Sequence, residues 1–142
     1  MHRFSKDQVF IEMAEKLALR GSCGRLSVGA LIVAQTKHII TSGVNGPNAW
    51  DCDELKCDTS KPCQYAIHAE DNAIRYALLN NIPLQGTTLY CTHMPCFACA
   101  ELIVKAGISR VVYGHAYRST AGIEFLKQNN ISTCHYYALP QL

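Results

Sequence analysis

Residues 87–106 read TTLYCTHMPCFACAELIVKA and join a strand to a helix that carries two cysteines. The run 87–92 predicts a strand, bounded by the turn signals before it. Pro95 suits the first position of a helix, where its missing N–H costs nothing, and Gly107 predicts the end of that helix. A strand that leads directly into a helix is typical of an α/β fold.

Outward from this stretch, helical and extended patterns alternate along the chain. Apolar residues at helical spacing, with Ser5 as N-cap, predict a first helix over residues 5–20. Residues 28–33 and 38–44 predict two strands that form a hairpin. The further elements that we expect are helices over 67–80, 95–106 and 121–128, strands over 109–114 and 131–137, and a long loop over 43–62. Together they predict an α/β sandwich around a mixed sheet.

Composition limits the class of protein. A chain of 142 residues predicts a single domain over 1–142, and a formal net charge of +2 without a Lys/Arg-rich run argues against a nucleic-acid partner. We see neither a secretory signal nor an apolar run long enough to span a membrane, so we expect a soluble, cytoplasmic protein without a membrane partner. Eight cysteines in a reducing compartment are better explained as metal ligands than as disulfides.

Two helix starts carry residues that could hold a metal ion. Cys96 and Cys99 are spaced to share a helix face, and the helix N-terminus should lower both thiol pKa values. His68 begins the preceding helix. One imidazole and two thiolates would leave the fourth position of a tetrahedral zinc ion to water. Taken separately, the Cys-x-x-Cys pair also fits a structural zinc or redox site, and a lone histidine also fits a core.

Glu70 favours a catalytic zinc site over these alternatives. The combination His-x-Glu followed by Pro-Cys-x-x-Cys marks zinc nucleobase deaminases. In that reaction a zinc-activated hydroxide attacks the ring, while Glu70 takes a proton from the water and delivers it to the ring nitrogen and the leaving amine.

The motifs resemble the cytidine deaminase superfamily and, within it, the deoxycytidylate (dCMP) deaminases. The shared segments are Cys-x-Arg running into Val-Gly-Ala at 23–30, Gly-x-Asn-Gly at 43–46, His-Ala-Glu-x-Asn-Ala-Ile at 68–74, the strand-to-helix unit at 88–100, and Gly-Ile-x-x-Val-Val-Tyr at 107–113. The resemblance implies a three-layer α/β/α sandwich with a mixed five-stranded sheet. It also implies hydrolysis of dCMP to dUMP and ammonia, a nucleotide as partner, and a homo-oligomer, often a hexamer.

The same resemblance assigns roles to individual residues. The ligands of the catalytic zinc would be His68, Cys96 and Cys99, and the proton shuttle would be Glu70. The substrate-binding residues would be Asn45, Arg25, Tyr117 and Ala69, with Arg25 and Tyr117 near the 5′-phosphate. From the residues alone, Asn45 also fits a favoured Asn-Gly turn, and Arg25 also fits a solvated surface arginine.

A second metal site and regulation are further implications. Some members of the family bind a structural zinc in this region, and here its ligands would be Cys23, Cys52, Cys57 and Cys63. Free thiols or disulfides are the alternative. Regulated members bind dCTP or dTTP, and Mg²⁺ could accompany such an allosteric nucleotide. Val44 stands where the family has tyrosine, which leaves open both regulation and the acceptance of a 5-modified cytosine.

Two other functions fit part of the pattern. One is deamination of another base, such as 5-modified dCMP, a tRNA adenosine or a free purine. The other is a zinc-binding module without catalysis, although a purely structural site has no use for the carboxylate of Glu70.

Overall fold

The structure is a computed structural model that describes residues 3–21, 26–46, 67–117 and 119–138. Its sheet contains β1 (Gly29–Val33), β2 (Ile39–Val44), β3 (Thr88–His93), β4 (Arg110–His115) and β5 (Ser132–His135), in the order β2-β1-β3-β4-β5. β1 pairs antiparallel with β2 and β3, whereas β3, β4 and β5 run parallel. The expected mixed five-stranded sheet is confirmed.

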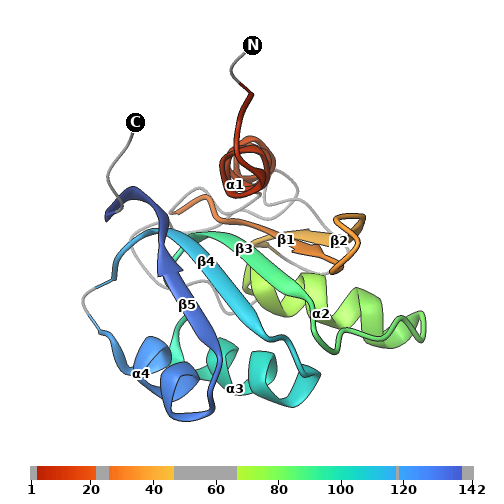
Figure 1. The fold of residues 1–142 in the computed structure, drawn as a ribbon, viewed down its shortest axis with the longest axis vertical. Coiled ribbons are helices and arrows are strands. Elements are labelled where there is room, and N and C mark those ends of the chain that lie inside the picture. Colours follow the sequence, from red (N-terminus) through yellow and green to blue (C-terminus); the bar gives the residue numbers. More distant parts are fainter. Residues whose placement is uncertain (1–2, 22–25, 47–66, 118, 139–142) are drawn as a thin grey trace, which may run out of the picture.

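Helices cover both faces of this sheet (Figure 1). The helix α1 (Lys6–Ala18) lies on one face, and α2 (Ala69–Leu79), α3 (Phe97–Ala106) and α4 (Ala121–Gln128) lie on the other. A short 3₁₀ helix, η1 (Tyr136–Ala138), follows β5. The arrangement is the expected three-layer α/β/α sandwich.

Each face of the sheet buries its own apolar cluster, because side chains alternate along the central strands. Leu31, Val112 and the α1 residue Ile11 belong to the smaller cluster. Leu89 and Val111 point the other way and belong to the larger cluster with residues of α2, α3 and α4. Burying one such side chain contributes about 1.5–3 kcal/mol, so packing on both faces fixes the strands that end at the site.

A partly buried ion pair joins α1 to the sheet. Arg110 of β4 donates from Nη1 and Nη2 to the two carboxylate oxygens of Asp7, at 2.8 and 2.7 Å. The hydroxyl of Tyr90 in β3 donates to the same carboxylate at 2.7 Å. The first turn of α1 is therefore attached to two neighbouring strands at once.

Several expected boundaries differ from the observed ones by one or two residues: α2, for example, begins at Ala69, and His68 is its N-cap. Two further differences have a clear structural cause. Pro95 is not the first helical residue: Cys96 is the N-cap, with extended backbone angles of φ −72° and ψ 171°, and α3 begins at Phe97. The last strand ends at His135 rather than at residue 137, because Tyr136 turns into the α1-side cluster and starts η1. Ser5 does cap α1, since its Oγ accepts from the backbone N–H of Gln8 at 3.1 Å.

Candidate metal centre and active site

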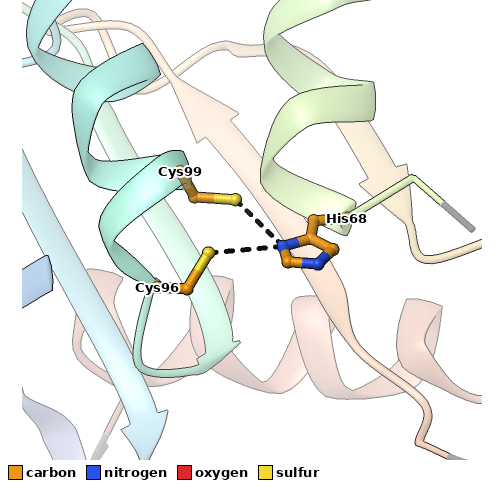
Figure 2. A group of neighbouring side chains, drawn as sticks. All are labelled: His68, Cys96 and Cys99. Atoms are coloured by element: carbon orange, nitrogen blue, oxygen red, sulfur yellow. Dashed lines mark hydrogen bonds between the residues drawn. The ribbon is translucent and has the colours of Figure 1, made fainter. Parts of the chain in front are cut away.

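The two helices that carry the candidate metal ligands have their N-termini close to each other. His68 is the N-cap of α2 and has an extended backbone, so its imidazole lies off the helix end. Cys96 occupies the same position at the start of α3, and Cys99 lies in the first turn. Figure 2 shows the imidazole facing both sulfurs across the gap between the helices.

The three side chains make a compact donor set. His68 Nδ1 lies 3.4 Å from Cys96 Sγ and 3.3 Å from Cys99 Sγ (Figure 2). All three ligand atoms lie within 4.8 Å of one another, and within the described residues this is the one group of at least three such side chains that could hold a metal. The expectation that His68, Cys96 and Cys99 come together is therefore met.

These distances fit a zinc ion. Nitrogen and sulfur ligands bind zinc at about 2.0–2.1 and 2.3 Å, so two of them at a tetrahedral angle lie about 3.5 Å apart. The two nitrogen-to-sulfur separations, 3.4 and 3.3 Å, are close to that value. One imidazole with two thiolates is also a donor set that zinc prefers.

The pKa values of the two thiols are shifted in opposite directions. Hydrogen bonds with Cys99 and His68 lower the pKa of Cys96 to about 4. The pKa of Cys99 is raised, because its thiol is hydrogen-bonded to Cys96 and buried, with Glu70 nearby. The expectation that both pKa values are lowered is thus met for Cys96, where these hydrogen bonds are the cause, and is wrong for Cys99. Since zinc binds thiolates, its binding here would release the Cys99 proton.

Glu70 lies in the first turn of α2, beside this donor set, and is only 4% exposed. Burial raises the pKa of its carboxyl to about 7, although the hydrogen bond with Cys99 and the charge of His68 act in the opposite direction. A carboxyl with such a pKa can both accept and donate a proton near neutral pH.

The described substrate-side residues occupy different surroundings. Asn45 is buried: its Oδ1 accepts from the backbone N–H of Val28 at 2.7 Å, and its Nδ2 donates to the carbonyl of Leu26. Ala69 is fully buried in the first turn of α2. Asn45 therefore fixes the entry to β1, and its contact with a nucleotide stays a prediction, as does that of Ala69.

Tyr117 lies near the donor set and is 39% exposed. Burial and the nearby carboxylate of Glu70 raise the pKa of its hydroxyl, and the charge of Cys96 adds to the effect. The hydroxyl of Tyr117 is therefore within electrostatic range of both residues. Its proposed contact with a 5′-phosphate stays a prediction.

His93 also takes part in this region, although the sequence motifs assign it no role. His93 is instead the last residue of β3, and its ring stacks on Tyr117. Its Nδ1 lies 2.8 Å from Thr92 Oγ1, which accepts from the backbone N–H of Gly29 at 3.2 Å. Its position between the predicted strand 87–92 and the Pro-Cys-x-x-Cys motif was the available signal.

Several candidates fall outside the described residues. They are Arg25 and the four cysteines expected at a second zinc, namely Cys23, Cys52, Cys57 and Cys63. Their roles stay predictions.

Comparison with known proteins decides the family. A family model described as the cytidine and deoxycytidylate deaminase zinc-binding region matches residues 4–115. The chain belongs to this family. His68, Glu70, Cys96 and Cys99 all lie within the matched residues.

Individual deaminases and one operon protein are similar over most of the chain. ComE operon protein 2 of Bacillus subtilis is 40% identical over 122 residues, which are 84% of this chain and 64% of that protein. The deoxycytidylate deaminase of Mycobacterium phage D29 is 35% identical over 127 residues, which are 80% of this chain and 97% of the phage protein. The chain thus spans less than two thirds of the Bacillus relative but nearly all of the phage enzyme.

A solved structure of the family has the same fold. The dCMP deaminase of cyanophage S-TIM5, in complex with dCMP and dUMP, superposes with a TM-score of 0.81 at 29% identity, over 93% of this chain and 98% of the phage chain. The expected cytidine deaminase-like fold is confirmed.

Among the described helices, none has both the length and the apolar character needed to cross a membrane.

Proposed function

We propose that this protein hydrolyses dCMP to dUMP and ammonia. The observation that carries the proposal is the buried carboxyl of Glu70 beside the convergent donor atoms of His68, Cys96 and Cys99. The names of the phage relatives support dCMP as the substrate: one is called a deoxycytidylate deaminase, and the other was solved with dCMP and dUMP.

His68, Cys96 and Cys99 would hold the zinc. When bound, zinc supplies the acidity that brings the pKa of a coordinated water toward neutrality. Glu70 accepts a proton from the attacking water and passes it to the ring nitrogen beside the amino-bearing carbon. The water oxygen becomes the new carbonyl oxygen of dUMP, and its second proton leaves with the amine as ammonia.

The site's own groups favour this proton transfer. Because Glu70 is buried and its pKa is about 7, the free energies of its two protonation states are nearly equal at neutral pH. Proton transfer to and from such a group typically contributes about 10²–10⁴-fold to a rate.

Substrate recognition is the finer part of the proposal. Tyr117, in its stack with His93, would face the nucleotide, and Arg25 would pair with the 5′-phosphate, since guanidinium groups bind phosphate by paired hydrogen bonds. Nδ2 of Asn45 carries two hydrogens, so a contact with the sugar is compatible with its bond to Leu26.

Other expectations also stay proposals. They are a Cys₄ structural zinc, a homo-oligomer such as a hexamer, control by dCTP and dTTP with Mg²⁺, and a cytoplasmic location. Zinc coordination could replace apolar packing in a long loop, which is the physical reason for the Cys₄ site.

The test is ammonia release by the purified zinc-loaded protein from dCMP, cytidine, dCTP, guanine and 5-hydroxymethyl-dCMP. We expect the highest kcat/KM with dCMP. A higher value with guanine or with the modified nucleotide would replace dCMP by another base. Release from none of them, by protein with bound zinc, would favour a zinc-binding module and overturn the proposal.

A further inference from the structure

Gly122 in the first turn of α4 lies directly against the chain that carries one metal ligand. A Cβ atom added at Gly122 would lie 2.2 Å from the carbonyl oxygen of Pro95 and 2.9 Å from the carbonyl carbon and oxygen of Cys96. These are backbone atoms, so no side-chain rotation can relieve the overlap. Only a hydrogen fits between α4 and the N-cap of α3.

The same two helices also meet through their aromatic residues. The rings of Phe97 and Phe125 lie 5.0 Å apart between centroids, at an angle of 60°. Phe97 directly follows Cys96, so α4 contacts the chain at Cys96 and at the residues on both sides of it. This packing holds the Cys96 backbone where its sulfur faces His68.

Gly43 of β2 lies against the backbone of α2, just as Gly122 lies against the backbone at the start of α3. A Cβ there would lie 2.3 Å from the carbonyl oxygen of Ala69 and 2.7 Å from the backbone nitrogen of Ala73. Asn72 Nδ2 donates to the carbonyl of Val44 at 2.7 Å, and Thr41 Oγ1 donates to the carbonyl of Ala73 at 3.2 Å. The first turn of α2, which follows His68, therefore packs closely against the backbone of β2.

We propose that Gly43 and Gly122 are positioning residues that set the separation of the two helix N-termini, and with it the distance between His68 and Cys96. The inference rests on the proposed metal centre and not on which base is deaminated. A well-formed zinc site has ligand distances within about 0.2 Å of the usual values. A methyl group at either glycine would need a larger displacement of α2 or α3, because the overlaps are with backbone.

The test compares Gly122→Ala and Gly43→Ala with Gly107→Ala. Gly107 ends α3 at φ +81°, so alanine strains the same helix, but at the end away from Cys96. Zinc affinity is measured by chelator competition, and ligand geometry by the absorption bands of the cobalt-substituted proteins, at a temperature where circular dichroism shows each variant folded.

We expect Gly122→Ala and Gly43→Ala to weaken zinc binding about 10-fold or more and to shift the cobalt bands, as changes around metal ligands do. Gly107→Ala should lower the melting temperature and leave affinity within about 2-fold and the bands unchanged. Wild-type affinity and spectrum in Gly122→Ala and Gly43→Ala would overturn the inference, and so would equal shifts in Gly107→Ala.

A variant that does not fold is replaced by Phe125→Ala, which removes the ring contact with Phe97 and adds no atom. We expect it to release zinc several-fold faster than the wild type, and an unchanged release rate would contradict the role of α4. A wild type that takes up no zinc would overturn the metal centre and this inference together. A failure of dCMP turnover alone leaves the zinc and cobalt measurements valid.

Discussion

The imidazole of His93 stacks on the ring of Tyr117, with centroids 5.8 Å apart and an angle of 27° between the planes. His93 is held in turn by Thr92, whose hydroxyl also binds the backbone N–H of Gly29. A chain of contacts therefore runs from β1 through the end of β3 to a tyrosine near Glu70.

His93→Ala should loosen Tyr117 and weaken substrate binding. A stacked aromatic pair contributes about 0.5–1.5 kcal/mol, which corresponds to a rise in KM for dCMP of about 2- to 10-fold, with a smaller change in kcat. His93→Phe keeps the stack and should restore most of the affinity. Steady-state kinetics test this, and an equal loss in both variants would show that stacking is not what His93 contributes.

Tyr117→Phe keeps the ring and removes the hydroxyl. If that hydroxyl contacts the 5′-phosphate, KM should rise about 10- to 150-fold for dCMP and stay unchanged for deoxycytidine, because the loss of one hydrogen bond to a charged group weakens binding by about 1.5–3 kcal/mol. KM values for the nucleotide and the nucleoside are compared in the same buffer. Equal effects on both substrates would argue against a phosphate contact.

Glu70→Gln should abolish turnover and leave zinc bound. Glutamine has the size of the carboxyl side chain but cannot carry a proton between water and the leaving amine, so kcat should fall by at least about 10²–10⁴-fold. Zinc content by metal analysis and ammonia release are measured on the same sample. Glu101→Gln, a partly buried residue of α3, is the matched control and should keep its turnover.

Retention of activity within a few-fold in Glu70→Gln would mean that another group moves the proton. Loss of zinc from this variant would instead show that Glu70 supports the metal site, and its assignment as a shuttle would then need a different test.

Metal analysis should give about two zinc ions per chain if the Cys₄ site exists, and about one if it does not. Replacing Cys52 and Cys57 by serine should then remove one zinc and lower thermal stability, since binding energy at a structural site is folding energy. Prolonged chelation should abolish turnover, and added zinc should restore it. A ratio near one that the double replacement does not change would remove the second site.

The metal centre could be predicted because each of its parts is local in sequence. His68 and Glu70 are two residues apart, Cys96 and Cys99 are three apart, and both pairs lie at helix starts. Pro95 indicates the second of these starts to within two residues. Helix geometry then fixes which side chains share a face. The order of the strands in the sheet was not predicted.

The neighbours of the metal centre depend on pairing that no local pattern specifies. His93 and Tyr117 meet because β3 and β4 run parallel with His93 opposite His115, two residues before Tyr117. The role of Gly122 depends on where α4 docks, and a glycine inside a helical pattern indicates only that some close approach is needed. The sequence predicts that Asn45 lies in a turn, but it does not predict the hydrogen bond between Asn45 and the backbone just before β1.

The ion pair between Asp7 and Arg110 should make stability depend on pH below about pH 4. The guanidinium of Arg110 lowers the pKa of Asp7 from 3.8, with the Tyr90 hydroxyl acting in the same direction, although burial opposes them. A carboxyl with a lowered folded-state pKa stabilises the fold fully above its unfolded-state value. That contribution is lost as the pH falls through the folded-state value.

Asp7→Asn should therefore lower the free energy of unfolding by about 1–2 kcal/mol at pH 7, because the paired hydrogen bonds to Arg110 are partly buried. The difference from the wild type should shrink below about pH 4, as the wild-type carboxyl itself becomes protonated. Urea unfolding of both proteins at several pH values between 7 and 3 measures this difference in the free energy of unfolding. Any effect of metal release is common to both proteins and cancels in the difference. Asp71→Asn, which breaks the exposed pair with Arg75, should change stability by no more than about 0.5 kcal/mol. A difference for Asp7→Asn that stays constant down to pH 3 would show that packing of the side chain, and not its charge, attaches α1 to the sheet.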